Sequence, residues 1–226
     1  MINSYKTTSS PSPASTNSKV CSLNISIGNL NQVGDKLAST IEWANKHFDK
    51  AIINLGDTLQ RHNLMALGEI NHHNKSKYLG DIWLKDNEAE LKYFEIPYEI
   101  KRWDDWLCMD KVQRKISLAR QIYASDEMMA ESLLTDAVDY ADRFARGFSD
   151  HHVDFILEEI GVHSYMAEAI QGLAFVYPSN RMRCYEYLSN HLAGDIIGLN
   201  KAVFIRSMTK KRKDRKPSSI DVKLVA

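Results

Sequence analysis

Residues 20–57 read VCSLNISIGNLNQVGDKLASTIEWANKHFDKAIINLGD, and this stretch decides the fold. Residues 20–26 and 51–57 are short, apolar and rich in β-branched side chains, which is typical of buried strands. Between them, apolar residues recur every three or four positions and predict one face of a helix: Val33, Leu37, Ile41, Ala44 and Phe48. A strand, a helix and a second strand in so short a segment predict a parallel βαβ unit with a right-handed crossover.

The composition agrees with one ordinary domain. The chain has 226 residues, of which 44% are hydrophobic and 26% charged, and its net charge is zero. This length can bury a substantial core. A neutral chain has no global field that draws it to nucleic acid or membrane, so phosphate contacts must come from local clusters.

The cysteines and the apolar runs indicate the compartment. Cys21, Cys108 and Cys184 lie far apart without a CxxC pair, which indicates a reduced, intracellular chain. No apolar run reaches the length of a membrane span, and the N-terminus lacks the apolar stretch of a secretory signal. A cytoplasmic protein is therefore predicted.

Further helices and strands are predicted after the βαβ unit. The helical patterns cover residues 58–91, 103–147 and 150–173, with a shorter helix at 189–197. Ser125-Asp126 is a predicted helix cap, and so is Ser149 or Asp150. The strand-like segments cover residues 91–100, 174–187 and 201–208. The alternation predicts a single α/β domain around a central, mostly parallel sheet.

The two ends of the chain differ in composition from this domain. Residues 1–19 are mostly Ser, Thr, Pro and Asn, and we predict a disordered tail. The folded domain is predicted to span residues 20–208. Residues 209–226 begin with TKKRKDRKP and are predicted to form a basic C-terminal tail.

Ser26 is the first candidate for chemistry, because it ends the first strand just before a Gly-Asn turn. Ligands of open parallel sheets bind at the carboxyl ends of the strands. Gly28 allows a close turn, and the backbone amides after it are suited to stabilise an oxyanion or hold a phosphate. The segment is not a P-loop, a GxGxxG fingerprint or a GxSxG elbow. These residues alone leave Ser26 open as a nucleophile or as a helix cap.

The wider pattern resembles the cyclodipeptide synthase family. ISIGN followed by IEWANKHFDKAIINLGDT resembles that family's Gly-Ile-Ser-x-x-Asn turn, its helix with Trp-Ala and Phe, and its second strand with an acidic end. YMAEAI (165–170) resembles the helix that carries the family's catalytic glutamate. PSNRMRCYEY (178–187) resembles its Pro-Ser-Ser turn before a catalytic tyrosine. The resemblance covers about residues 20–208 and implies a Rossmann-like domain similar to the catalytic domain of class I aminoacyl-tRNA synthetases.

The resemblance implies roles for individual residues. Ser26 would be the nucleophile that takes the first aminoacyl group, Glu168 would hold its amino group, and Tyr185 would relay protons. Asn29 matches the asparagine of one family branch, and with Gly28 it is predicted to contact substrate. A carboxylate beside an ammonium holds the amine by charge pairing until the amine must lose its proton. From the residues alone, Glu168 also fits a solvated carboxylate and Tyr185 a half-buried strand aromatic.

Several departures from the family pattern indicate a divergent member. Asn24 stands where the family has glycine, at a position expected to face the substrate. Residues 30–32 are LNQ instead of Ser-Tyr-Phe, and Glu186 replaces a histidine. The family's substrate-anchoring tyrosine falls at Ser164, beside Tyr165, and a helix would allow either residue to stand near the predicted glutamate.

The resemblance implies aminoacyl-tRNA as the partner. The family docks tRNA on a basic helix soon after the second strand, but acidic residues dilute the basic ones in this chain. The predicted tRNA-binding residues are Lys75, Lys77, Lys111, Arg114 and Lys115, and the run KKRKDRK (210–216) could add to them. Each phosphate contact adds to a salt-dependent affinity. A solvated basic face and a solubilising tail remain the alternative.

Two histidine pairs, His72-His73 and His151-His152, raise the question of a metal. Adjacent residues on a helix point about 100° apart and do not easily face one ion. No HExxH motif or cysteine partner lies near them. We interpret them as surface histidines and predict no metal site.

The sequence therefore predicts a tRNA-dependent cyclodipeptide synthase, an aminoacyltransferase that uses two aminoacyl-tRNAs in turn through an acyl-Ser26 intermediate. The tRNA ester already carries the activation energy, so no cofactor is predicted. Two alternatives remain: a variant transferase with a non-cyclic product, and a non-catalytic aminoacyl-tRNA-binding domain. A monomer is favoured, and the sequence does not identify the amino acids.

Overall fold

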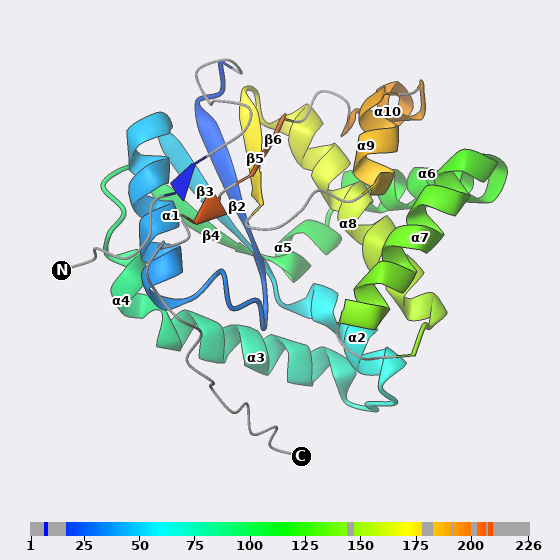
Figure 1. Ribbon diagram of the computed structural model, residues 1–226, viewed down its shortest axis with the longest axis horizontal. Helices are drawn as coiled ribbons and strands as arrows, with labels where there is room; N and C mark the ends of the chain where they lie inside the picture. Colours follow the sequence, from blue (N-terminus) through cyan, green and yellow to red (C-terminus); the bar gives the residue numbers. More distant parts are fainter. Residues whose placement is uncertain are drawn as a thin grey trace, which may run out of the picture.

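A computed structural model describes residues 7–8, 17–143, 147–177, 183–190, 192–199, 203–206 and 208–209. Within these residues, five parallel strands form one sheet in the order β4-β3-β2-β5-β6 (Figure 1). The strands are β2 (Val20–Ser26), β3 (Lys50–Gly56), β4 (Tyr98–Arg102), β5 (Leu173–Tyr177) and β6 (Val203–Arg206). Counted along the chain, this order is that of a doubly wound, Rossmann-like sheet. The predicted fold class is confirmed.

A second, small sheet joins two segments near the chain ends. β1 (Thr7–Thr8) pairs antiparallel with β7 (Met208–Thr209). Thr7–Thr8 belongs to the segment predicted to be disordered, and in the structure it forms a strand. The rest of residues 1–16 and residues 210–226 lie outside the described residues, so both predicted tails remain predictions there.

Helices cover both faces of the large sheet (Figure 1). Those before β4 are α1 (Gly34–His47), a 3-10 turn η2 (Thr58–Gln60), α2 (Arg61–Ala66), α3 (His72–Asp86) and α4 (Glu88–Leu91). Those after it are α5 (Trp103–Leu107), α6 (Asp110–Ser125), α7 (Glu127–Arg143), α8 (Asp150–Ala169), α9 (Arg183–Asn190) and α10 (Leu192–Ile197). α1 and α4 lie on one side of the sheet and α5 to α10 on the other, while α3 lies across the end to which β2 points.

Each face of the sheet has its own apolar core. Side chains alternate along a strand, so odd-numbered residues of β2 face α1 and even-numbered ones face α8. The core on the α1 face includes the predicted helix residues Leu37, Ile41, Ala44 and Phe48. The core on the α8 face is larger and joins the inner sides of α5 to α10 to the sheet.

Two predicted strands proved shorter, for identifiable reasons. Residues 91–100 are predicted as one strand, but β4 begins only at Tyr98, directly after Pro97, which has no N–H to donate to a ladder. Residues 174–187 are also predicted as strand-like, but β5 ends at Tyr177 and α9 begins at Arg183. The buried side chains of Cys184 and Leu188 lie four residues apart, which is helical spacing.

The predicted helix caps are confirmed. Asp126 Oδ1 accepts a hydrogen bond from the backbone N of Met129 at the start of α7 (2.9 Å). Ser149 Oγ accepts one from the backbone N of His151 at the start of α8 (3.3 Å). Among the described residues, no helix combines the length and apolar character that crossing a membrane requires.

α8 is buried on nearly all sides and runs antiparallel to the sheet. It ends at Ala169, and β5 begins four residues later beside Val20 at the amino end of β2. The N-terminal half of α8 therefore lies level with the carboxyl ends of the strands, and its last turn lies near their amino ends. α6 packs closely on α8, because a Cβ added at Gly161 would lie 2.7 Å from the backbone N and Cα of Ile116.

This close approach predicts the effect of adding one methyl group to α8. Gly161→Ala would normally favour a helix by about 1 kcal/mol. Here the backbone of α6 must move, and we expect the free energy of unfolding to fall by about 1–3 kcal/mol instead. Denaturant unfolding measures the change.

The matched control is Gly147→Ala, since a Cβ at Gly147 would meet no atom within 4 Å. We expect this variant to unfold within about 0.5 kcal/mol of the unsubstituted chain. An unchanged or increased stability of Gly161→Ala would contradict the close packing of α6 on α8.

Candidate active site

Ser26 is the last residue of the central strand β2, and its side chain lies on the α8 face. The residue is half-buried. Its carbonyl accepts a hydrogen bond from the backbone N of Asn29 (3.1 Å), and Gly28 has φ +88°, a left-handed conformation that favours glycine. The predicted Gly-Asn turn is confirmed, and it leaves the serine at the end of the sheet where α/β proteins bind ligands.

Gln32 holds the backbone around Ser26. Its Oε1 accepts from the backbone N of Ser26 (2.7 Å), and its Nε2 donates to the carbonyl of Asn24. Its own carbonyl accepts from Trp83 Nε1 of α3 (3.2 Å). The loop is therefore attached both to β2 and to the helix that crosses this end of the sheet.

Gln60 contacts the Ser26 hydroxyl directly. Gln60 Nε2 donates to Ser26 Oγ (3.2 Å), and Gln60 Oε1 accepts from Asn63 Nδ2 (2.7 Å). Because Gln60 uses its NH₂ on the serine, Ser26 Oγ is an acceptor in this contact, and its own proton remains available to a base.

Asn24 lies two residues before Ser26 in β2, and its side chain points to the same face of the sheet, toward α8. Its Oδ1 accepts from Ser22 Oγ (2.7 Å) and from Asn54 Nδ2 (3.1 Å). Asn54 Oδ1 in turn accepts from Trp106 Nε1 (2.8 Å). The parallel register places the two asparagines opposite each other. Asn24 is buried, so its amide fills space where a glycine would leave a cavity.

A cluster of buried polar side chains lies where α8, β5 and α9 meet; we call it the tyrosine cluster. His163 Nδ1 lies 2.9 Å from Tyr177 OH and 3.3 Å from Tyr185 OH. Tyr185 also forms a hydrogen bond with Glu159. Tyr177 ends β5, next to the central strand, and its side chain alternates onto the α8 face. Of the predicted catalytic residues, the tyrosine cluster contains Tyr185.

Burial governs the ionisation of this cluster. Desolvation raises the pKa of Glu159 to about 7, although the hydrogen bond with Tyr185 lowers it in part. Burial also lowers the pKa of His163 to about 3, so the imidazole is neutral at physiological pH. The pKa of Tyr185 lies well above its ordinary value, because of burial first and the Glu159 charge second. Glu159 is therefore the group in the cluster that exchanges a proton near neutral pH.

The pKa of the adjacent carboxyl group, Glu158, is shifted in the opposite direction, below its ordinary value. Its Oε1 accepts from Trp103 Nε1 (2.7 Å) and Arg61 Nη1 (2.9 Å), and its Oε2 lies 3.2 Å from His62 Nε2. Burial alone would raise its pKa, but the hydrogen bonds and charges of His62 and Arg61 outweigh burial and lower it to about 2. Glu158 is therefore ionised at neutral pH, and its contacts connect α8 to α2 and α5.

The structure does not bring Glu168 to Ser26. Glu168 lies in the last turn of α8, near the amino ends of the strands, and its side chain is 62% exposed. It forms an ion pair with Lys115 of α6 (2.7 Å). The buried acidic residues of α8 are Glu158 and Glu159, and both lie in the half that is level with the carboxyl end of the sheet, as the contact of Glu158 with Trp103 directly after β4 indicates.

The structure also shows the surroundings of Ser164 and Tyr165, the other residues of α8 that are predicted to contact substrate. Ser164 is fully buried, and its Oγ has no hydrogen-bond partner among the described residues. Tyr165 packs edge-on against Trp106 of α5, with ring centroids 6.3 Å apart. Neither side chain is described in contact with Ser26 or Glu168.

The predicted tRNA-binding residues fall into two separate places. Lys75 and Lys77 are exposed on α3, and the carbonyl of Lys77 accepts from Arg102 Nη2 (2.7 Å). Arg102 also donates to buried Asp57 at the end of β3 (2.6 Å), so α3 lies at the Ser26 end. Lys115 lies beside Glu168 instead, which places the α6 group Lys111, Arg114 and Lys115 toward the amino end of the sheet.

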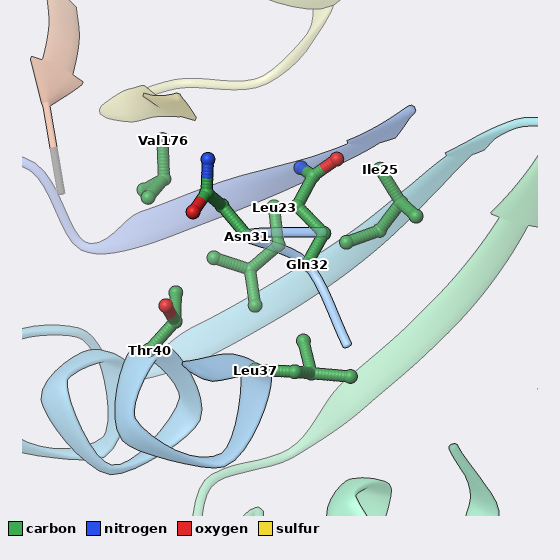
Figure 2. Close-up of a pocket in the computed structure, with 7 residues that line it drawn as sticks. All are labelled: Leu23, Ile25, Asn31, Gln32, Leu37, Thr40 and Val176. Carbon is green, nitrogen blue, oxygen red and sulfur yellow. The ribbon is translucent and has the colours of Figure 1, made fainter. Parts of the chain in front are cut away.

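A pocket lies on the opposite face of β2 (Figure 2). It is lined by residues of β2, β5, α1 and the loop between β2 and α1: Leu23, Ile25, Asn31, Gln32, Leu37, Thr40 and Val176. Because Leu23 and Ile25 alternate with Asn24 and Ser26, this pocket does not adjoin the Ser26 hydroxyl.

Sequence reasoning missed Gln32, Gln60, Glu159 and His163. The two glutamines follow turns and belong to no recognised motif, and Gln60 reaches Ser26 only through the register of β2 with β3. Glu159 and His163 did carry a signal. They are polar residues at i and i+4 in a helix whose other residues are mostly apolar, a pattern that indicates a partnered polar site in a core.

Comparisons with known proteins identify the fold. No protein-family model and no curated protein sequence matches the chain. A cyclodipeptide synthase structure from Fluoribacter dumoffii matches with a TM-score of 0.81 and 23% identity, over 92% of this chain and 99% of that one. A cyclodipeptide synthase from Candidatus Glomeribacter gigasporarum, bound to Phe-tRNAPhe, matches with a TM-score of 0.58 and 16% identity, over 92% and 93% of the two chains.

A third structure connects this fold to tRNA synthetases. The Mycobacterium tuberculosis protein, described as demonstrating that cyclodipeptide synthetases are related to type I tRNA-synthetases, matches with a TM-score of 0.65 and 12% identity. The match covers 87% of each chain. The chain therefore has the cyclodipeptide synthase fold, at a low sequence identity that agrees with a divergent resemblance.

The raised pKa of Glu159 predicts how stability depends on pH. In the unfolded chain this carboxyl ionises near its ordinary pKa of 4.5, but in the folded chain it ionises near 7. Its contribution is therefore fully present below pH 4.5 and is lost as the pH rises to 7. We expect Glu159→Gln, which is neutral throughout, to gain about 2–3 kcal/mol relative to the unsubstituted chain between pH 5 and pH 8.

Urea unfolding of both proteins at the two pH values measures this difference. The comparison removes the contribution of His163, whose lowered pKa acts in the opposite direction below pH 6.5. A stability difference that does not change with pH would mean that Glu159 ionises normally in the folded chain.

Proposed function

We propose that the chain is a tRNA-dependent aminoacyltransferase of the cyclodipeptide synthase type. The observation that carries the proposal is the fold, which matches a cyclodipeptide synthase over 92% of the chain and has a serine at the end of its central strand. The matching structure bound to Phe-tRNAPhe supports aminoacyl-tRNA as the substrate class.

In the proposed reaction, Ser26 Oγ attacks the ester carbonyl of the first aminoacyl-tRNA. A serine ester forms, the ester bond to the tRNA breaks, and the tRNA hydroxyl leaves with a proton. The free amine of this serine-bound aminoacyl group attacks the ester carbonyl of a second aminoacyl-tRNA. A peptide bond forms, the second tRNA hydroxyl leaves with a proton, and a dipeptidyl enzyme results. Attack of the free amine on the serine ester releases the cyclic dipeptide and regenerates the Ser26 hydroxyl.

We propose Glu159, in place of Glu168, as the carboxylate that handles protons. A group with a pKa of about 7 both accepts and releases protons at neutral pH, which is what general acid–base catalysis requires. Its hydrogen bond with Tyr185 links it to the residue for which the family resemblance implies a relay. Glu168 is exposed instead, and it pairs with Lys115 toward the other end of the sheet.

We propose α3 as the side on which the tRNA docks. It crosses the Ser26 end of the sheet and carries exposed Lys75 and Lys77 (Figure 1). Lys75 forms an ion pair with Glu69, which reduces the positive charge offered to a phosphate. The α6 group lies at the other end of the sheet, so we do not include it in this proposed tRNA-binding surface.

One observation favours the variant transferase as a second candidate. Asn24 is buried beside Ser26 and bonded to Ser22 and Asn54, where a glycine would leave room for a side chain of the acyl group. A filled site favours a small first aminoacyl group or a different acceptor amine. The product of the reaction separates these possibilities.

The test mixes the purified protein with charged tRNAs and analyses protein and products by mass spectrometry. We expect an aminoacyl adduct on Ser26 and a cyclic dipeptide. Ser26→Ala should lose the adduct and lower product formation by about 10³-fold or more, because the nucleophile is gone. Ser117→Ala, which changes an exposed serine of α6, is the matched control.

Each outcome of this test has a distinct meaning. An adduct with a linear product supports the variant transferase. Binding of charged tRNA without an adduct supports the non-catalytic domain and contradicts the enzyme. Equal activity of Ser26→Ala and the unsubstituted chain would remove Ser26 from the mechanism.

A second pair of variants decides between the two glutamates. We expect Glu159→Gln to lower the rate of product formation by about 10²–10⁴-fold, because a neutral amide cannot accept a proton. Glu168→Gln, which removes only an exposed ion pair, should change it less than about 3-fold. Urea unfolding of Glu159→Gln at the pH of the assay checks that the protein is folded, so that unfolding does not explain a loss of activity. A large loss of activity in Glu168→Gln with little loss in Glu159→Gln would contradict this proposal and support Glu168 as the catalytic carboxylate, as the sequence predicts.

A further inference from the structure

Figure 1 shows α2 beside the N-terminal turns of α8. Three side chains of the types that bind metals come together between these two helices. One ligand atom each from His62, His151 and Asp154 lies within 4.8 Å of the other two. His151 and Asp154 lie three residues apart and so share one face of α8. His62 comes from the first turn of α2 and is buried.

The two imidazoles each present a nitrogen with no partner. His62 is 7% exposed, and its Nδ1 has no hydrogen bond among the described residues. The same holds for His151 Nδ1. Buried imidazole nitrogens usually have a partner, and these two belong to side chains whose ligand atoms lie within 4.8 Å of each other.

The second nitrogen of His62 is already oriented. His62 Nε2 lies 3.2 Å from Glu158 Oε2. A carboxylate that accepts from one imidazole nitrogen leaves the other as a lone-pair donor, which is the usual arrangement behind metal-bound histidines. Arg61 pairs with Glu158, and Arg120 contacts Asp154 Oδ1 at 3.2 Å, so both carboxylates are also held from outside the group.

We propose that His62, His151 and Asp154 form a binding site for a divalent transition metal of the Zn²⁺ type. Two imidazole nitrogens and one carboxylate oxygen suit Zn²⁺, and three protein ligands leave one position of a tetrahedral ion open. The bound ion would hold α2 against α8. Gln60, which contacts the Ser26 hydroxyl, immediately precedes α2, so the site adjoins the segment that positions that hydroxyl.

This proposal revises the sequence interpretation of the histidines. Sequence reasoning considered His151 with its neighbour His152 and rejected a shared ion. The structure separates these two: His152 Nδ1 accepts from the backbone N of Ser149 (3.1 Å) at the helix cap. The partner of His151 is His62, 89 positions earlier in the chain.

The test adds Zn²⁺ alone to the purified full-length protein after chelator treatment. Titration calorimetry measures affinity, and the metal content after desalting measures stoichiometry. We expect one strongly bound Zn²⁺ per chain. His151→Ala and Asp154→Asn should each lower the affinity by more than about 100-fold, because loss even of an outer partner costs 10–100-fold.

His73→Ala is the matched control, because it removes an exposed histidine of the other pair on α3 and should leave the affinity unchanged. Circular dichroism checks that each variant is folded, which is expected since His151 and Asp154 are half-buried. No binding above the level of buffer, or equal binding by His151→Ala and the unsubstituted chain, would overturn the proposal. The readout is independent of the aminoacyl transfer reaction, so it stands or fails separately.

Discussion

The burial of α8 constrains most of the site. This helix lies between the sheet and the helices α6 and α7, so each polar side chain that it carries must find a partner inside the protein. Four of its buried residues are Glu158, Glu159, His163 and Ser164. The partners of Glu158, Glu159 and His163 come from elements far apart in the sequence, and those contacts join α2, α5, β5 and α9 to the helix. Ser164 Oγ has no hydrogen-bond partner among the described residues.

The surroundings of two adjacent residues of α8, Glu158 and Glu159, shift the pKa values of their carboxyl groups in opposite directions. Glu158 faces Arg61, His62 and Trp103, and its pKa is about 2. Glu159 is buried beside Tyr185, and desolvation raises its pKa to about 7. Separation of the pKa values of two neighbouring acids is a common way for a protein to assign one a structural role and the other a proton-transfer role. In this chain the two sides of one helix supply the two environments.

Much of the fold followed from local patterns. The period of apolar residues in 20–57 predicts β2, α1 and β3, and the structure has all three. Local chemistry also predicted the turn at Gly28 and the caps at Asp126 and Ser149. The strand ends near Pro97 and Tyr177 were less predictable, because β-branched and aromatic residues there also pack well in loops and helices.

The sequence by itself determined the class of the fold and the position of Ser26 at the end of the first strand of the βαβ unit, because periodicity and turn chemistry act over a few residues. Only the tertiary structure decided which side chains share the space around that strand. Glu159 and Glu168 lie nine residues apart on one helix, which is about 13 Å along its axis. The antiparallel course of α8 against β2 places the first near the carboxyl end of the sheet and the second near the amino end. The same packing joins His151 to His62, a contact that no local pattern contains.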